Sequence, residues 1–517
     1  MGQPSSPSPT IYKSQRRGTA YWSLSMAPSS PSCGRRPQRR SSRRSLLPKR
    51  TASKARPEMF RLWLATLRVD TLAVVAPLAA TLTSAVFVQL SLFFLIGAHS
   101  PAVEAQLAAV SYGSSFRGFI TVIAVYMIVV GVGLPVVVTQ ISLGRMLVRL
   151  RVQTIGQWRL LGATSWQIRR VMFGELYAIT LISTALATVL AIPLAEPATN
   201  VVMSMTDYDI IVEPVVGSTA LVWSLVIMLT LCTLGALGPA RTAARVSPRS
   251  ARRDDVSSGS RKTRVMALVI SGLCLLAAIA TAASFLVGSS PAPGTNVLLM
   301  NALLVASVAT GGTAVLGPIV SLITRPLRDS RRASFFLAGH TAAARVRTSA
   351  IVFLAPYIGA ALLGGFISGS LTYARAAGLE SGTSSLLQGL VFYGPAAAIG
   401  LIGALTAVVV RGRPDARGQA LLTSAGADRR ALLTAPVIET TLYFALAVVL
   451  TAVSVVGPAA LYALSLARAG SSGALVVSVV PPLIFLILAF ILVAGVLVGP
   501  ARVVGRQSVR ESLRTTT

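Results

Sequence analysis

The sequence predicts an all-α integral membrane protein of ten transmembrane helices, arranged as two parallel four-helix repeats joined by two further helices, with a disordered N-terminal tail. Three observations predict this class. Hydrophobic residues make up 53% of the 517 residues and charged residues 12%, which is about half the charged share of a soluble domain. Ten apolar runs are long enough to cross a bilayer. Basic residues are concentrated in alternate connections between these runs.

Residues 1–57 form the predicted disordered tail. They are rich in Ser, Pro and Arg and poor in aliphatic residues, so they bury too little apolar surface to offset the entropy lost on ordering. The basic stretch 35–56 has the charge to bind anionic phosphates on lipid or nucleic acid. Met59 stands just before the first apolar run and is an alternative start, in which case the tail is not translated.

The net charge of +31 would indicate nucleic-acid binding in a polar chain. A mean hydropathy of +0.71 argues against that class, and we expect no specific nucleic-acid partner. The two histidines and three cysteines are too few and too widely separated for a metal cluster or a disulfide framework. We therefore expect no metal site, no catalytic residue and no cofactor in this chain.

Ten mainly apolar runs predict the membrane-spanning helices, because ~20 residues of helix cross the hydrocarbon core of a bilayer. They lie at about 72–97, 117–140, 171–195, 218–238, 265–288, 297–324, 349–371, 389–410, 433–461 and 475–498. Prolines within them, such as Pro77 and Pro356, are expected to kink the helices rather than end them.

The charge of the connecting segments orients these helices. If the N-terminus is inside, only three of the 47 Lys and Arg residues, Arg117, Arg375 and Arg468, lie outside, and the other 44 lie inside. The positive-inside rule then places both termini in the cytoplasm, and the even number of spans agrees. We expect a multi-pass membrane protein.

The chain also repeats itself. A Gly-Ala pair begins at Gly162 and again at Gly426, and a glutamate follows each glycine after thirteen residues, at Glu175 and Glu439. Each pair stands just before a predicted span, the third and the ninth. The same residues thus recur at the same distances in two halves of the chain.

Further matches support two parallel copies. The fourth and tenth runs both end in Gly-Pro-Ala-Arg, at 238–241 and 499–502, and Pro77 and Pro356 correspond in the first and seventh runs. Both copies enter and leave the membrane on the same side, which makes them parallel rather than inverted repeats. The predicted domains are the tail 1–57, a first unit 61–255, a linker 256–334 with two transmembrane helices, and a second unit 335–517.

These motifs resemble those of the FtsX-like permease family. The stretch 160–170, Leu-Leu-Gly-Ala-Thr-Ser-Trp-Gln-Ile-Arg-Arg, is followed by Glu175 and a span, and the motif at 238–248 is similar to the usual ending of that domain. A weaker second copy runs from Thr423 to Glu439 and ends at 499–506. The resemblance covers about 61–255 and 335–506. It implies a membrane subunit of an ABC transporter in the bacterial plasma membrane, as in lipoprotein-release, macrolide-export and peptide-antibiotic-resistance systems.

The predicted outside loops depart from many relatives. Those relatives carry a large extracytoplasmic domain after the first span of a unit, whereas the corresponding loops here, 98–116 and 372–388, are short. A mechanism that hands cargo to a tall external conduit is therefore not expected.

The chain has no Gly-x-x-x-x-Gly-Lys-Ser/Thr phosphate loop, so ATP hydrolysis must come from a separate subunit. The resemblance implies a cytoplasmic ATPase dimer, carrying ATP and Mg, that docks on the connections after the second and eighth spans. In the first connection, apolar and basic residues at helical spacing predict a surface helix with a knob for this partner. The alternative is an inert interfacial helix with snorkelling arginines. The expected docking residues are Trp158, Arg159, Leu161, Gly162, Ala163, Arg169, Arg170, Gly426, Ala427, Arg429 and Arg430.

Two sets of acidic residues need an explanation. Glu175 and Glu439 are expected in the first turn of spans 3 and 9, where the helix dipole or a salt bridge would stabilise them, or where they transmit ATPase motion. The acidic residues of the outside loop 196–217 could attract a cationic substrate or could simply be tolerated outside. They are Glu196, Asp207, Asp209 and Glu213.

The predicted function is a permease, not an enzyme, that couples a separate ATPase to the export or extraction of an amphiphile: a lipid, lipoprotein, peptide antibiotic or drug. One alternative is a mechanical transmitter that regulates an extracytoplasmic hydrolase or a sensor kinase, although short outside loops offer such a partner little to hold. Another is an ion-coupled secondary carrier, which would need acidic residues near span centres.

Overall fold

The computed structural model describes residues 71–108, 124–204, 211–247, 261–287, 293–376, 383–424, 428–468 and 475–504, and the single residues 118, 121, 378, 426 and 470. The chain divides into two units, Met1–Trp63 and Leu64–Thr517, and all described residues belong to the second. The predicted tail 1–57 lies outside the described residues.

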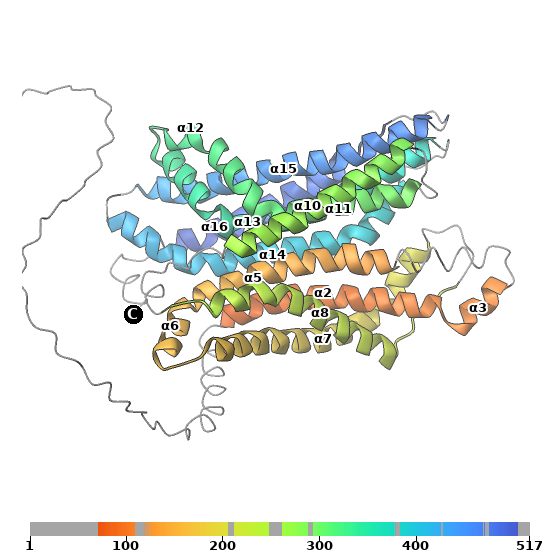
Figure 1. Cartoon of the computed structure of the whole chain (residues 1–517), viewed down its shortest axis with the longest axis horizontal. Helices are drawn as coiled ribbons and strands as arrows, with labels where there is room; N and C mark the ends of the chain where they lie inside the picture. The colour runs from red at the N-terminus through yellow and green to blue at the C-terminus, as the bar shows by residue number, and fades with distance from the viewer. Residues whose placement is uncertain are drawn as a thin grey trace, which may run out of the picture. The chain divides into compact units, whose positions relative to one another are not determined.

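Within these ranges every regular element is a helix (Figure 1). The first part of the chain forms α2 (Thr71–Ala98), α3 (Pro101–Ala108), η1 (Met127–Gly133), α5 (Leu134–Leu150), α6 (Val152–Leu160), α7 (Ser165–Met203) and α8 (Ser218–Ala243). The rest forms α10 (Arg261–Val287), α11 (Pro293–Ile323), α12 (Arg325–Arg328), α13 (Ala333–Ala376), α14 (Thr383–Ser424), α15 (Arg429–Arg468) and α16 (Val480–Val504).

The membrane-spanning segments follow the apolar runs with one exception. Within the described residues, nine helices are long and apolar enough to cross a membrane. The sixth predicted span is instead a bent pair, Asn296–Gly312 and Ala314–Ile323, whose axes differ by 74°. Gly311 and Gly312 weaken the helix at the bend, and Pro318 removes a backbone donor nearly two turns later, so both features favour a break. The count reaches ten only if this pair is one broken span.

The connections after the second and eighth predicted spans are largely helical, and the helix predicted in the first connection is present as α6. α5 continues to Leu150 and is followed by α6, and α14 continues to Ser424. Arg, Ala, Leu and Gln dominate these stretches and are good helix formers. A short turn at 161–164 follows α6, and Gly426 and Asp428 are the residues described between α14 and α15.

The described helices pack as two groups that meet along α14 (Figure 1). In the first, α2 packs against α7 and α8, and α5 packs against α8; in the second, α13 packs against α14, α15 and α16. Across the boundary, α14 contacts α2 and α5, and α13 contacts α5. α10 and α11 pack against each other, and α11 lies on α13 and α15. The two linker helices thus cover the second group.

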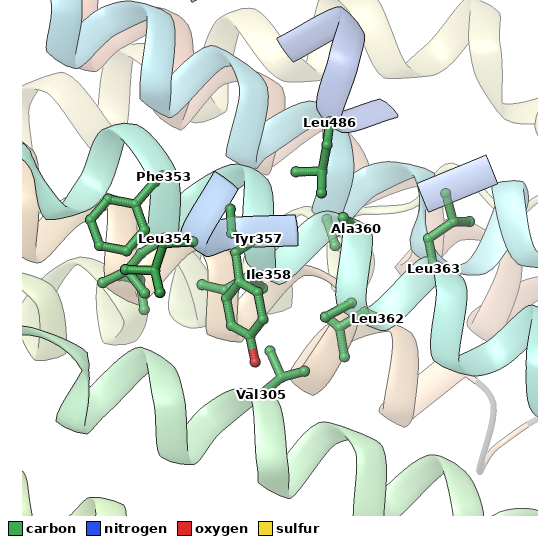
Figure 2. Close-up of a cluster of buried hydrophobic side chains, with 14 of the residues drawn as sticks. Val305, Phe353, Leu354, Tyr357, Ile358, Ala360, Leu362, Leu363 and Leu486 are labelled. Carbon is green, nitrogen blue, oxygen red and sulfur yellow. The ribbon is translucent and has the colours of Figure 1, made fainter. Parts of the chain in front are cut away.

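α13 is the central helix. The apolar part of its span, within Val352–Ala376, is buried throughout, whereas only 6% of the apolar window of Arg264–Ser284 in α10 is buried. Figure 2 shows α13 side chains, among them Tyr357, between Val305 of α11 and Leu486 of α16. The Tyr357 hydroxyl also lies 2.8 Å from the Ser454 hydroxyl of α15. Packing on several sides thus fixes α13.

Candidate functional site

The turn between α6 and α7 is closed by helix caps at both sides. The N–H of Gly162 donates to the Arg159 carbonyl (3.1 Å) and the N–H of Ala163 donates to the Trp158 carbonyl (2.9 Å). These two bonds form a Schellman cap, which needs a left-handed residue, and Gly162 has φ +88°. The Thr164 hydroxyl then accepts from the Gln167 N–H, while the Gln167 side chain accepts from the Thr164 N–H, as a capping box. The sequence Gly-Ala-Thr therefore sets one defined turn.

This turn presents three large apolar side chains to the exterior. Leu160, Leu161 and Trp166 are 72%, 83% and 57% exposed. The Arg170 guanidinium carbon lies 4.8 Å from the centre of the Trp166 ring, so a cation–π contact holds the ring. We call Leu160, Leu161 and Trp166 the apolar knob. Neither Leu160 nor Trp166 was among the predicted docking residues.

Beneath the apolar knob, buried side chains anchor the turn to the bundle. Ile155 of α6 and Ile168 of α7 pack in one cluster with Ala240 and Ala243 of α8. Trp158 packs against this cluster and is only partly exposed. The apolar knob therefore stands on a rigid base formed by three helices.

The remaining residues predicted to dock in this turn divide by exposure. The Arg159 guanidinium donates to the Ser165 hydroxyl (2.9 Å) and to the Ala244 carbonyl at the end of α8. Arg159, Ala163 and Arg169 are partly buried, whereas Gly162 and Arg170 are exposed. Arg159 therefore ties the turn to α8, and the surface open to a partner is formed by Leu161, Gly162 and Arg170 with the two missed residues.

A buried ion pair lies behind the turn. The Arg151 Nη1 atom is 2.5 Å from the Glu175 Oε2 atom, and the side chains are 8% and 1% exposed. Arg151 is the break residue between α5 and α6, and Glu175 is on α7. The expectation that Glu175 lies in the first helical turn was wrong, because α7 begins ten residues earlier, at Ser165. A partner at the break between α5 and α6, rather than the helix dipole, accounts for this buried carboxylate.

The connection before α15 shares two features with the turn before α7. Gly426 also has φ +88°, and the Asp428 carboxylate accepts from the Arg430 N–H (3.2 Å), so Asp428 stands where Thr164 stands in the first turn. Arg430 is exposed and Arg429 is the first residue of α15. Glu439 is buried (4% exposed) and also lies eleven residues into its helix, away from the first turn. Ala427 lies outside the described residues.

The acidic residues predicted in the loop 196–217 do not form one described group. Glu196 is exposed but belongs to α7, which continues to Met203 through Pro193 and Pro197. Glu213 is exposed in the extended segment before α8. Asp207 and Asp209 lie outside the described residues. Among the residues described, no three His, Cys, Asp or Glu side chains gather as a metal site.

An apolar cavity of about 510 Å³ lies near the ends of the helices farthest from the turns. Four segments line it: α2, η1, the C-terminal part of α7 and the N-terminal part of α14. Representative lining residues are Leu90, Phe94, Met127, Ala198, Val202 and Leu390. Its volume falls in the range of small-molecule sites. The sequence motifs did not indicate it, because its walls come from helices far apart in the chain.

These features define a multi-pass helical membrane protein. Residues 121–248 match the family model described as FtsX-like permease C-terminal. The matched segment runs from the second predicted span to just past the fourth, and the match confirms the resemblance found in its motifs. No match to a curated protein was found for the chain. Such permeases are membrane subunits of ABC-type systems, generally without catalysis of their own, and normally work with a cytoplasmic ATPase.

Proposed function

We propose that the chain is the permease subunit of an ABC transporter, in which a separate cytoplasmic ATPase dimer drives export or extraction of an amphiphile. The observation that carries the proposal is the apolar knob within the family-matched segment. Three large apolar side chains exposed together on a rigid base are typical of a surface that a partner covers. The ATP and Mg would be held by the partner.

A second docking point is proposed at the turn of Gly426. The equal φ of Gly162 and Gly426 supports two copies of one unit. The pairing of α2 with α14 and of α13 with α5 also supports them, because the first helix of each unit then contacts the second helix of the other. We define the first unit as α2, η1, α5, α7 and α8, and the second unit as α13 to α16. Two parallel units would offer one turn to each ATPase of the dimer.

The proposed location is the bacterial plasma membrane, with both termini and both turns in the cytoplasm. The concentration of 44 of the 47 basic residues on the segments assigned to that side supports this orientation. The apolar cavity would then lie in the outer half of the bilayer, within reach of a membrane-borne amphiphile.

The ion pair suggests how motion would pass from the turn to the membrane. Because Arg151 and Glu175 join the start of α6 to α7, a push on the apolar knob would move α7 together with the turn. α7 packs against α2, whose far end lines the cavity. Glu439 is proposed to hold the same position in the second unit.

The test is copurification of the tagged chain with the ATPase of its host, followed by measurement of ATP hydrolysis in lipid. Leu161→Asp should abolish copurification, because it places a charge at the most exposed position of the apolar knob. Gln157→Asp, at an exposed polar position on α6, is the matched control and should retain it. If the wild-type chain brings down no ATPase and amphiphile movement survives deletion of the ATPase, the proposal fails. ATP-dependent activation of a hydrolase or sensor kinase without movement of any amphiphile would establish the mechanical transmitter instead.

A further inference from the structure

The two proposed units have matching residues at equal spacings, so corresponding positions in them can be compared. They differ at one such place. Leu90 lies thirteen residues after Pro77 on α2, and Gly369 lies thirteen after Pro356 on α13. Ala198 lies 23 residues after Glu175 on α7. Tyr462 lies 23 residues after Glu439 on α15. Leu90 and Ala198, both in the first unit, line the apolar cavity together with residues of α14. Gly369 and Tyr462 mark the corresponding place in the second unit.

In the second unit this place is filled by α11. Val297 and Met300 of α11 are 1% and 2% exposed and cluster with Tyr462. A Cβ added at Gly369 would lie 3.3 Å from the Val297 Cγ1 atom, so the glycine admits that side chain. The side chain of α11 thus lies where the first unit has open space beside Leu90.

Polar contacts hold α11 in this place. The Asn301 side-chain amide donates to the Ala361 carbonyl of α13 (3.2 Å). The Tyr126 hydroxyl, just before η1, donates to the Leu298 carbonyl (2.7 Å). The Asn301 bond is buried and the Tyr126 bond is partly buried, where alternative partners for these groups are few. α11 is therefore held by polar contacts in the place that it fills in the second unit.

The chemistry of the open cavity favours an aliphatic chain. The hydroxyls of its lining, on Ser91 and Thr199, donate to the Phe87 and Ala195 carbonyls of their own helices (both 2.9 Å). They are therefore already engaged and offer no free donor to a polar ligand. A helix 10–12 Å wide fills roughly 400–600 Å³ per turn, so about 510 Å³ would hold about one turn. A narrow alkyl chain fits this space better than a partner's transmembrane helix, which needs contact over ~20 residues.

We propose that the chain has a single binding site for the aliphatic chain of an amphiphile, in the apolar cavity between the first unit and α14, and that α11 fills the equivalent site beside α13 and α15. One chain therefore binds one aliphatic tail. The proposal rests on the function and the repeats proposed above, and it deepens them by naming the part of the amphiphile that is recognised.

The test uses the full chain in vesicles, without ATPase or nucleotide, and a phospholipid with a photoactivatable group in its acyl chain. Labelled peptides should come from α2 and α7 at the cavity. Ala198→Phe, which imitates Tyr462, should lower this labelling about tenfold, equivalent to ~1.4 kcal/mol. Val189→Phe, at a 69% exposed position of α7 outside the cavity lining, is the control and should leave labelling unchanged. Equal labelling in Ala198→Phe and the wild type would overturn the proposal.

A second arm tests α11. Val297→Ala combined with Met300→Ala should open the second site, so that α13 and α15 peptides become labelled and the bound chains rise from one toward two per protein. If those peptides are labelled in the wild type as strongly as the α2 and α7 peptides, α11 does not fill the second site. A photoactivatable acylated peptide, used in parallel, distinguishes a lipid tail from a lipoprotein tail. Cavity labelling without ATPase copurification would leave this inference standing and would count against the proposed function alone.

Discussion

The guanidinium of Arg151 and the carboxylate of Glu175 form an ion pair at 2.5 Å, with both side chains almost fully buried. The two residues are 24 positions apart in sequence and meet because the chain breaks between α5 and α6 at Arg151 and returns through the turn of Gly162. The pair therefore joins the start of the turn-forming segment to the helix that follows it.

Removal of one partner should destabilise the protein strongly. Glu175→Ala leaves a buried arginine without its carboxylate partner, which costs about 3–5 kcal/mol. Arg151→Met combined with Glu175→Leu should recover most of this loss, since apolar residues of similar size need no charge partner there. Thermal unfolding in detergent measures both. Glu196→Ala, at an exposed position of the same helix, is the control, and an equally large effect there would contradict the assignment.

The positive φ of Gly162 predicts a cost for any side chain at this position. Gly162→Ala should lower the free energy of unfolding by about 1–2 kcal/mol, because a left-handed backbone is unfavourable for L residues. Gly426→Ala should cost a similar amount, since its φ is the same. Gly174→Ala on α7, where an added Cβ would meet nothing within 4 Å, should be neutral or stabilising. Urea or thermal unfolding of the three variants compares them directly, and identical losses at 162 and 174 would refute the turn argument.

Two tryptophans close together in sequence should behave oppositely. Trp166 is 57% exposed, so Trp166→Ala should leave thermal stability unchanged but weaken ATPase association by about 30-fold, as for a ~2 kcal/mol interface residue. Trp158 packs against the cluster of Ile155 and Ile168, so Trp158→Ala should lower stability by about 3 kcal/mol. Unfolding curves and a binding titration with purified ATPase separate the effects. A stable Trp158→Ala variant would show that the turn does not rest on this cluster.

The contact between α13 and α14 depends on a glycine. An added Cβ at Gly359 would lie 2.5 Å from the Ala397 Cα atom, and backbone cannot move aside as a side chain can. Gly359→Ala should therefore cost about 1–3 kcal/mol through overpacking. Gly457→Ala on α15 meets nothing within 4 Å and should have little effect. Thermal unfolding of the two variants measures the difference. An unchanged unfolding temperature for Gly359→Ala would mean that α13 and α14 can move apart to admit the added Cβ.

Much of the fold could be predicted because bilayer thickness sets the length of apolar runs. Runs such as 72–97 and 218–238 coincide closely with Pro77–Ala98 and Ser218–Ala243. Their ends were harder to predict, because a helix continues past the apolar stretch as long as its residues favour helix. For this reason α7 continues through Glu196, and α14 continues to Ser424. The bend in α11 was missed because glycine and proline inside a span allow a break without requiring one.

Interactions between neighbouring residues are sufficient to predict the turn of Gly162, but not the contacts that surround it. The spacing of Gly162, Thr164 and Gln167 encodes caps that form from neighbouring residues, and the sequence by itself determined that turn and the family motif around it. The direction in which Leu160 and Trp166 point, the pairing of Arg151 with Glu175, and the cavity between α2, η1, α7 and α14 were decided only by the tertiary structure. Each depends on how helices pack against one another, and helix packing is set by shape and burial, which spacing along one helix does not encode.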